Sequence, residues 1–190
     1  MRLDNINTLG VIGDRHTCKT NLMFYLAKNY KGSKEKYLLG YPIKMQGFTS
    51  INTLSELSMV TEGLVLCDEI QKVIPFYSKR MNDTLLEVLS TMAHNENSFI
   101  FSTCLSQFIT KALDGFIDGF CYTKIQDLAV LKNGSKAKRR LSEFSHSKVN
   151  QWSLNLKKGE YIEIIDNNEI GSNGLKKFPN QRIKKDWKAK

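Results

Sequence analysis

Apolar and polar positions along residues 8–125 follow two alternating patterns. Short continuous apolar runs, which are typical of buried parallel strands, occur at Thr8–Ile12, Gly63–Cys67 and Ser98–Thr103. Between these runs lie longer stretches with apolar residues at helical spacing. Strands that alternate with helices indicate a mainly parallel sheet with helices on both faces. The sequence therefore predicts an α/β fold.

The remaining elements of this region follow from the same patterns. Further strands are expected at Tyr37–Tyr41 and Gly119–Ile125. Helices are expected from Lys19 to about Tyr30, over Asn82–His94 and over Leu105–Leu113. Asn82 or Asp83 can cap the second of these helices, because short polar side chains accept hydrogen bonds from the first N–H groups.

The pattern changes after Leu131. Residues 132–140 are polar, basic and rich in turn formers, and residues 152–165 contain two β-prone stretches around a Lys-Lys-Gly-Glu turn. These stretches predict a β-hairpin added to the sheet. Gly171–Lys190 is expected to be an extended basic tail.

Charge divides the chain in the same way. Residues 1–131 contain 13 basic and 13 acidic residues, whereas residues 132–190 contain 15 basic and 6 acidic ones. The whole net charge of +9 therefore lies in the last third. Such a segment is suited to contact a polyanion, most simply nucleic acid, although a solubilising tail is the alternative. We expect a core at 1–131 and a basic C-terminal extension with the hairpin at 132–190.

Composition argues against several other classes of protein. No apolar run approaches the roughly 20 residues that span a bilayer, and the first residues lack the apolar stretch of a signal peptide. We therefore expect a cytoplasmic protein with no membrane contact. The four cysteines and three histidines show no metal-ligand spacing, which argues against a structural metal or a disulfide framework.

A phosphate-binding loop is predicted after the first strand. Gly13–Thr20 follows the pattern G-x-x-x-x-G-K-[ST], except that Cys18 replaces the second glycine. Lys19 is expected to reach the β- and γ-phosphates of a nucleotide, and Thr20 is expected to bind Mg²⁺. Backbone N–H groups of the loop and the helix N-terminus would surround the phosphates. The expected nucleotide-binding residues are Gly13, Asp14, Arg15, His16, Thr17, Cys18, Lys19, Thr20 and Asn21.

Cys18 gives this loop a testable departure from the pattern. A small side chain is tolerated at this position if the backbone is right-handed. If the position requires a positive φ, nucleotide affinity or turnover should suffer.

An acidic pair ends the strand Gly63–Cys67. Asp68 is expected to hold the Mg²⁺ shell, and Glu69 is expected to orient and deprotonate the attacking water. Two adjacent carboxylates at the end of a buried strand repel one another, and a metal ion with a nucleotide offsets that repulsion. This pair turns a prediction of nucleotide binding into one of hydrolysis.

The next strand ends in polar residues that can sense the γ-phosphate. The candidates are Ser102, Thr103 and Gln107, and Gln107 is the one expected to take part in catalysis. An arginine is also expected where charge builds up during phosphoryl transfer. The sequence does not choose among Arg15 acting within the subunit and Arg80, Arg139 or Arg140 acting on a neighbouring subunit.

Taken together, these motifs resemble the additional-strand ATPases. Within that class they are similar to the FtsK/HerA-like genome-packaging ATPases of tailless viruses and, more loosely, to Zot-like phage assembly proteins. The resemblance covers about residues 8–125. It implies a RecA-like P-loop core with a strand inserted between the loop strand and the Asp-Glu strand. It also implies ATP and Mg²⁺ as cofactors, assembly into a homo-oligomeric ring, and ATP-driven movement of double-stranded DNA.

Other functions remain open from the sequence alone. In a packaging motor, the basic extension would face the DNA or dock to a portal or capsid protein. A slow nucleotide-dependent switch or helicase loader would fit the departure at Cys18. A small-molecule kinase would need an arginine-rich lid and an acceptor site, and neither is evident.

Overall fold

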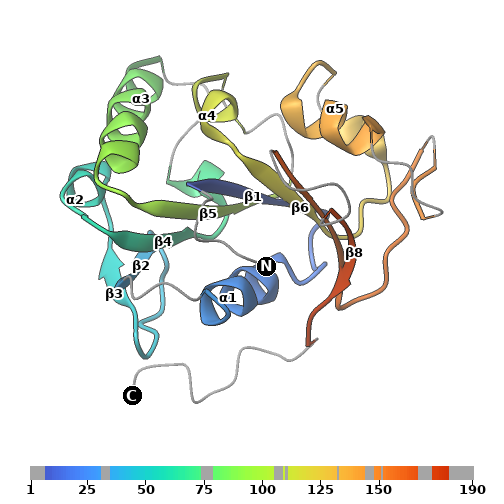
Figure 1. Cartoon of the computed structure of the whole chain (residues 1–190), viewed down its shortest axis with the longest axis horizontal. Coiled ribbons are helices and arrows are strands. Elements are labelled where there is room, and N and C mark those ends of the chain that lie inside the picture. Colours follow the sequence, from blue (N-terminus) through green and yellow to red (C-terminus); the bar gives the residue numbers. More distant parts are fainter. Residues whose placement is uncertain are drawn as a thin grey trace.

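The computed structural model describes residues 7–30, 35–73, 79–104, 109, 111–131, 133–143, 148–150, 152–166 and 173–179. Within these residues eight strands form one sheet in the order β3-β2-β4-β5-β1-β6-β7-β8 (Figure 1). The strands are β1 (Thr8–Ile12), β2 (Glu35–Leu39), β3 (Thr49–Ile51), β4 (Gly63–Cys67), β5 (Ser98–Thr103), β6 (Gly119–Tyr122), β7 (Glu160–Ile165) and β8 (Gly174–Lys177). The helices are α1 (Lys19–Lys28), α2 (Leu54–Ser58), η2 (Ile70–Lys72), α3 (Lys79–His94), α4 (Lys111–Phe116), η4 (Leu128–Val130) and α5 (Lys136–Glu143). The predicted α/β fold is confirmed.

Strands β3 to β6 of this sheet are parallel. In their register, Ile12 lies opposite Thr103 of β5 on one side and Tyr122 of β6 on the other, and β5 also pairs with β4. The carboxyl ends of β4, β5, β1 and β6 therefore meet at one edge of the sheet, which we call the carboxyl edge. The strand expected between the loop strand and the Asp-Glu strand is β5.

Helices cover both faces of the sheet. Helix α1 packs on one face, and α2, α3, α4 and α5 pack on the other (Figure 1). All five residues of β1, all five of β4 and all six of β5 are buried, as their continuous apolar runs predict.

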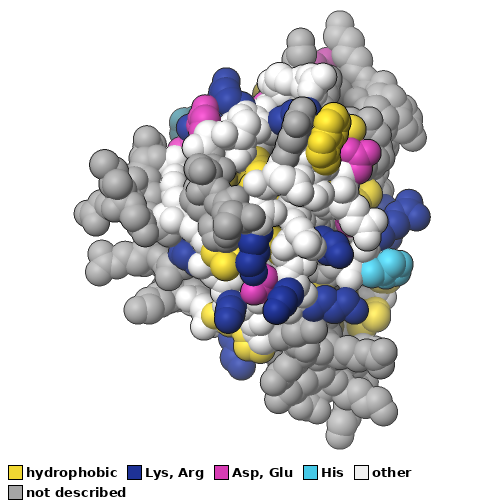
Figure 2. All heavy atoms as spheres, turned by 90° about the vertical axis from the view of Figure 1, so that its right-hand side faces the viewer, with side chains coloured by type: hydrophobic (Ala, Val, Ile, Leu, Met, Phe, Trp, Pro, Cys, Tyr) yellow, Lys and Arg dark blue, Asp and Glu magenta, His cyan; other side chains and the backbone are white. Residues whose placement is uncertain are grey.

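The β-hairpin differs from the prediction. β7 pairs antiparallel with β6 and with β8, whereas residues 152–156 contribute only isolated bridges from Leu154 to Ile125 and Val149. The stretch predicted as an extended tail thus contains a strand of the sheet, β8. β8 is mostly half-buried and carries two lysines, so its sequence lacks the apolar alternation of a strand. Figure 2 shows this side of the molecule, where lysine and arginine side chains gather around an acidic one.

Helix α5 replaces the turn-rich segment predicted at 132–140. Only Ala137 and Leu141, one helical turn apart, bury apolar side chains. The helix is held by charge as well, because Lys136 Nζ lies 2.8 Å and Arg140 Nη2 lies 2.7 Å from the Asp166 carboxylate. A helix with so little apolar periodicity cannot be recognised from the hydrophobic pattern.

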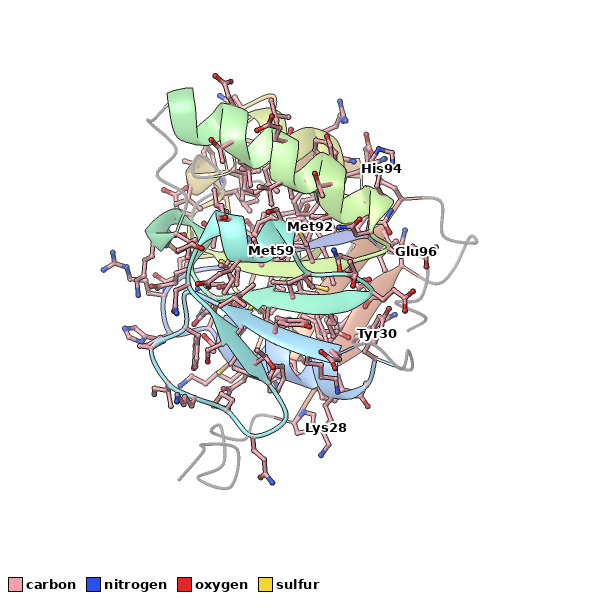
Figure 3. The ribbon with its side chains drawn as sticks, turned by 90° about the vertical axis from the view of Figure 1, so that its left-hand side faces the viewer. Lys28, Tyr30, Met59, Met92, His94 and Glu96 are labelled. Carbon is pink, nitrogen blue, oxygen red and sulfur yellow. The ribbon has the colours of Figure 1, made fainter. Side chains whose placement is uncertain are left out.

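Helix α3 shows how the apolar residues of a surface helix reach the core. Met92 points between α3 and the sheet and is buried, whereas His94 lies at the outer end of the helix (Figure 3). The spacing of Leu85, Leu89 and Met92 predicts this face. None of the described helices is long and apolar enough to cross a membrane.

Candidate active site

The phosphate loop begins at a close contact between β1 and the segment that follows β6. A Cβ atom added to Gly13 would lie 1.9 Å from Thr123 Oγ1 and 2.9 Å from Thr17 Oγ1, so only glycine fits. The Asp14 N–H donates to Lys124 O at 3.0 Å, and the Gln126 N–H donates to Asp14 Oδ2 at 2.7 Å. These bonds attach the start of the loop to the neighbouring strand.

Two residues of the loop have left-handed backbones. His16 has a φ of 62° and Cys18, the N-cap of α1, has a φ of 68° and a ψ of 26°. Left-handed residues within a turn direct successive backbone N–H groups toward one point, where an anion can bind. Cys18 thus occupies the conformation in which a side chain is strained and glycine is not.

Lys19 lies inside the loop. Its residue is only 8% exposed, and its Nζ atom donates to Asp14 O at 2.7 Å. Burial lowers the pKa of the Lys19 ammonium, while the nearby Cys104, Asp68 and Glu69 side chains oppose that shift. A buried cation at the N-terminal end of a helix favours an anionic ligand, and the phosphates of a nucleotide provide one.

Asp68, which follows β4, joins the loop to the next strand. Its Oδ2 accepts from Thr20 Oγ1 at 2.8 Å, and its Oδ1 accepts from Ser102 Oγ at 2.5 Å. Ser102 Oγ also accepts from the Glu69 N–H at 2.9 Å. The two acids and the loop threonine are therefore held together at the carboxyl edge.

Ser102 was one of three residues that the sequence offered as sensors of the γ-phosphate, with Thr103 and Gln107. In the structure the hydroxyl of Ser102 is buried and contacts the acidic pair. Thr103, the next residue, bonds to Gln71 Oε1 at 3.2 Å instead. Side chains of adjacent strand residues point to opposite faces, so these two hydroxyls have different partners.

Glu69 also has a left-handed backbone, with a φ of 54° and a ψ of 67°. Its side chain is 33% exposed and pairs with the exposed Lys72 ammonium on η2. A non-glycine residue in this region stores strain, and such strain is found mostly at functional sites. Glu69 is thus positioned beside Asp68 but remains accessible to solvent.

These residues fit a nucleotide with Mg²⁺. Asp68 and Thr20 offer the hard oxygen ligands that Mg²⁺ prefers, and Mg²⁺ usually takes one or two protein ligands and completes its shell with phosphates and water. Among the described residues no group of three or more His, Cys, Asp or Glu side chains could hold a metal by itself. The Thr17 and Thr123 side chains fill the space beside Gly13, so the start of the loop is closely packed against the segment that follows β6.

The other predicted site residues lie as follows. The Arg15 and His16 side chains are exposed, and those of Thr17 and Asn21 are half-buried. Arg140 is engaged with Asp166 and Glu143, whereas Arg139 is exposed on α5. Gln107 and the Arg80 side chain lie outside the part of the chain that the structure describes.

Thr123 was missed by the sequence analysis. Its Oγ1 lies 2.7 Å from Thr17 Oγ1 and it forms the wall against Gly13. No motif marks this residue; its role depends on β6 being the neighbour of β1, which the sequence alone does not specify.

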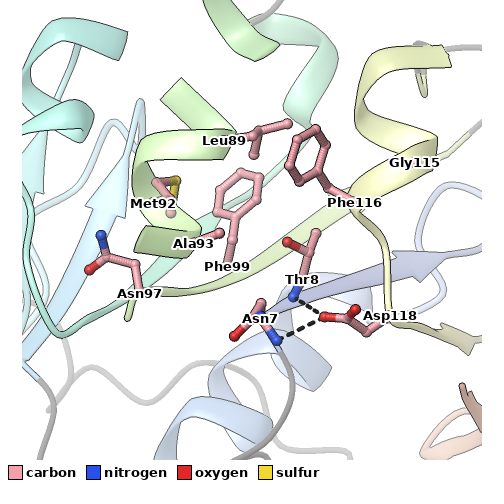
Figure 4. Close-up of a pocket in the computed structure, with 10 residues that line it drawn as sticks. All are labelled: Asn7, Thr8, Leu89, Met92, Ala93, Asn97, Phe99, Gly115, Phe116 and Asp118. Atoms are coloured by element: carbon pink, nitrogen blue, oxygen red, sulfur yellow. Dashed lines mark hydrogen bonds between the residues drawn. The ribbon is translucent and has the colours of Figure 1, made fainter. Parts of the chain in front are cut away.

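Cavities lie at both edges of the sheet. A cleft of about 450 Å³ at the carboxyl edge is lined by loop residues and by residues that follow β6. A smaller cavity of about 180 Å³ lies at the opposite edge, with an apolar floor that includes Phe99 and Phe116 (Figure 4). There Asp118 Oδ2 accepts from the N–H groups of Asn7 and Thr8 at 2.8 and 2.9 Å. Only the first cleft borders the phosphate loop.

The chain has similar solved structures, but its sequence matches no known family. No protein-family model and no curated protein matches the sequence. Among solved structures, the chain is similar to the genome-packaging NTPase B204 of Sulfolobus turreted icosahedral virus 2 in complex with AMPPCP. The TM-score is 0.59 at 12% identity, over 90% of this chain and 96% of that one.

Two further structures show the same likeness. The pCW3 conjugation coupling protein TcpA, in complex with ATPγS, has a TM-score of 0.56 at 9% identity, over 91% of this chain and 60% of that one. The N-terminal domain of the zonular occludens toxin from Neisseria meningitidis has a TM-score of 0.55 at 13% identity, over 91% and 94%. The chain therefore has the fold of the FtsK/HerA-like P-loop ATPases.

Proposed function

We propose that this protein is a motor that binds and hydrolyses ATP with Mg²⁺ and moves double-stranded DNA. The observation that carries the proposal is the contact of Thr20 with Asp68 at 2.8 Å, with Glu69 beside them. That contact unites the two motifs which phosphoryl transfer needs on one edge of the sheet. The similar structures are a genome-packaging NTPase and a conjugation coupling protein, which favours DNA as the moved substrate.

The residues of the loop would each have a defined task. The Lys19 ammonium would neutralise the β- and γ-phosphates, and Thr20 with Asp68 would hold Mg²⁺. Mg²⁺ would shield the phosphate charge when bound. Glu69 would accept a proton from the attacking water through its solvent-accessible carboxylate. Ser102, by its bonds to Asp68 and to the Glu69 N–H, would keep both acids in place.

Lysines at one end of β7 and β8 support a DNA contact. Lys148 Nζ lies 2.5 Å from Glu160 Oε2, and Lys176 pairs with the buried Glu163. Lys177 lies opposite Glu160 in the β7–β8 register, and Lys157 and Lys158 precede β7. We call Lys148, Lys157, Lys158, Lys176 and Lys177 the lysine cluster.

The five lysines of the lysine cluster and their two partners, Glu160 and Glu163, together carry a net charge of +3. Lys157, Lys158 and Lys177 are exposed. Because β7 runs antiparallel to β6, the start of β7 lies at the carboxyl edge with the nucleotide site. Exposed lysines contact phosphates without reading the base sequence. The cluster would therefore bind DNA of any sequence on the same edge as ATP.

A homo-oligomeric ring would complete the motor. Arg15 would act on the phosphates within its own subunit, or the exposed Arg139 would act on those of a neighbour. Arg140 is a poor candidate for a neighbour's site because its guanidinium is committed to Asp166 and Glu143. A portal or capsid protein would be a further partner if the moved DNA is a viral genome.

A slow nucleotide-dependent switch or helicase loader is the second candidate. Two observations favour it: the left-handed Cys18 in the loop and the pairing of Glu69 with Lys72. Strain at Cys18 would lower the affinity of the loop for phosphate. Lys72 would compete with the attacking water for the Glu69 carboxylate and so slow hydrolysis.

The ATPase rate with and without double-stranded DNA separates these functions. If the protein is a motor, double-stranded DNA should raise the ATPase rate severalfold. Glu69→Gln should abolish ATP hydrolysis, with and without DNA, and leave the affinity for ATP unchanged. Glu62→Gln is the matched control, because Glu62 has a similar φ of 49° but precedes β4 at the opposite edge. Binding of DNA without stimulation would favour the switch. Consumption of ATP only with a small acceptor would contradict both.

The DNA surface is tested by charge removal. Lys157→Ala, Lys158→Ala and Lys177→Ala together should weaken DNA binding and flatten its dependence on salt, because fewer counterions are released. The control removes Lys28, Lys36 and Lys44, three lysines near α1, β2 and β3. Equal losses in both variants would point to charge in general rather than to the lysine cluster.

A further inference from the structure

The order of the strands fixes the direction in which a bound nucleotide lies. Asp68 and Glu69 follow β4, which is separated from β1 by β5, and β6 lies on the other side of β1. If Glu69 acts at the γ-phosphate, the triphosphate must run from the β4 side toward β6. The nucleoside then lies over the residues that follow β6. This step rests on the proposed function.

The cleft of about 450 Å³ lies in that place. One wall consists of Asp14, Arg15 and Thr17 of the phosphate loop, and the other includes Lys124 and Gln126. Its size falls within the roughly 300–1,000 Å³ of small-molecule sites. The two walls are bonded to each other through Asp14, whose N–H donates to Lys124 O and whose carboxylate accepts from the Gln126 N–H, so their relative position is fixed.

An exposed tryptophan is attached to the far wall of this cleft. The Leu128 N–H donates to Trp152 O at 2.8 Å, and Asp127 and Val130 on either side of Leu128 line the cleft. The Trp152 residue is 71% exposed. Single exposed apolar side chains are common on protein surfaces. Trp152 is distinguished by its attachment beside the cleft and by a large ring face on which a base can stack.

The backbone that presents Trp152 is fixed. Asn150 Oδ1 accepts from the N–H groups of Trp152 at 2.8 Å and of Ser153 at 2.6 Å. Two residues on, Leu154 is fully buried and exchanges two backbone hydrogen bonds with Ile125, of 2.8 and 3.0 Å. The backbone beneath the indole is thus already ordered, so its ordering adds no entropy cost when the ring packs on a ligand.

We propose that this cleft holds the nucleoside of the triphosphate and that Trp152 stacks on its base. The exposed Gln126 side chain, on the wall opposite the phosphate loop, supplies an amide for the base edge or the ribose. Stacking on an aromatic ring tolerates any base. The site therefore distinguishes a nucleoside triphosphate from bare tripolyphosphate strongly, and ATP from GTP weakly.

The test uses the fluorescence of Trp152 in the chain of 190 residues. The chain contains two tryptophans, so Trp187→Phe leaves Trp152 as the sole reporter. ATP, GTP and inorganic tripolyphosphate are titrated into this variant. Both nucleotides should quench the indole, and tripolyphosphate should not. In a separate titration, Trp152→Ala should weaken ATP binding about tenfold and leave tripolyphosphate binding unchanged, whereas Trp152→Phe should retain most of the ATP affinity.

Met59→Ala provides the matched control, because Met59 is 77% exposed beside α2 and should affect neither ligand. The inference is wrong if tripolyphosphate binds as tightly as ATP, or if Trp152→Ala weakens both ligands equally. Either result leaves the proposed ATPase intact. If neither ligand binds and Lys19→Ala changes nothing, the proposed function fails together with the inference.

Discussion

Thr20 and Asp68 are 48 residues apart in the chain, and their side chains meet at 2.8 Å across the carboxyl edge. The bond joins the first turn of α1 to the residue after β4, although β5 separates β4 from β1, the strand that precedes the loop. It places a hydroxyl and a carboxylate at hydrogen-bond distance beside the phosphate loop. The two Mg²⁺ ligands of the proposed site are thus arranged by the protein itself.

Loss of the Thr20 hydroxyl should remove the dependence of ATP binding on Mg²⁺. Thr20→Ala takes away one ligand and one hydrogen bond to a charged group, which is worth about 1.5–3 kcal/mol. Calorimetric titration with ATP should show tenfold or greater weakening in Mg²⁺ and little change in EDTA. Thr20→Ser keeps the hydroxyl and should bind as the original does; equal weakening with and without Mg²⁺ would assign Thr20 a purely structural role.

Replacing Cys18 with glycine should raise both the stability of the protein and its rate of ATP hydrolysis. A non-glycine residue at positive φ costs on the order of 1–3 kcal/mol, and glycine loses part of that gain to chain entropy. We expect Cys18→Gly to raise the free energy of unfolding by about 1 kcal/mol in urea titrations and to increase kcat. Cys18→Ala, which keeps a Cβ, should do neither. A faster Cys18→Ala would show that the thiol rather than the backbone limits turnover.

Ser102→Ala should lower kcat about 10- to 100-fold with little change in KM, because the Ser102 hydroxyl contacts Asp68 and the Glu69 N–H rather than the expected nucleotide position. The measurement is the steady-state ATPase rate as a function of ATP concentration. Thr103→Val removes the adjacent hydroxyl, which bonds to Gln71, and should leave kcat nearly unchanged. A rise in KM alone would restore Ser102 to the sensor role expected from its sequence position.

Gly13→Ala should strongly destabilise the protein, because its Cβ would lie 1.9 Å from Thr123 Oγ1. The loss should exceed about 2 kcal/mol in chemical denaturation. Thr123→Ala removes the clashing oxygen, so the double variant should recover much of the lost stability. No recovery would mean that the clash with Thr17 or the altered backbone dominates.

Acid should destabilise the β7–β8 region through Glu160. The hydrogen bond from Lys148, and then that from the Lys157 N–H, hold the pKa of the Glu160 carboxyl below its usual value. A lowered folded pKa gives stability that is present above the unfolded value, about 4.3, and is lost as the pH falls through the folded value.

The free energy of unfolding should therefore fall between about pH 5 and pH 3, and Glu160→Gln should flatten this part of the curve. Lys148→Met should flatten it similarly, and the double variant should add little. Identical acid curves for all four proteins would show that other carboxylates govern acid unfolding.

The central part of the fold could be predicted from the sequence because it is buried on both faces. Continuous apolar runs mark β1, β4 and β5, and the phosphate loop and the acidic pair follow two of them. The outer parts carry weaker signals. β3 has three residues, and α2 is indicated only by a cap in which the Glu56 N–H donates to Thr53 Oγ1 at 3.1 Å.

The C-terminal part was predicted less well for a related reason. β8 and α5 are held by ion pairs of lysine and arginine with Asp166 and Glu163, and such pairs leave no hydrophobic periodicity. In the site, the loop and acids could be named from motifs. Thr123 and the partners of Ser102 could not, because they depend on the order of the strands.

The attachment of the phosphate loop to the segment after β6 places one strand between the two proposed binding surfaces. One side of β6 supports the loop through Gly13 and Asp14, and the other side pairs with β7, whose end carries lysines. If occupancy of either surface shifts β6, DNA and ATP must alter each other's affinity by the same factor. Measuring both sides of that cycle, ATP affinity with and without DNA and DNA affinity with and without a non-hydrolysable ATP analogue, would reveal whether β6 acts as the shared element. Equal factors above one would identify positive coupling, and factors of one would show that β6 is a rigid wall between independent sites.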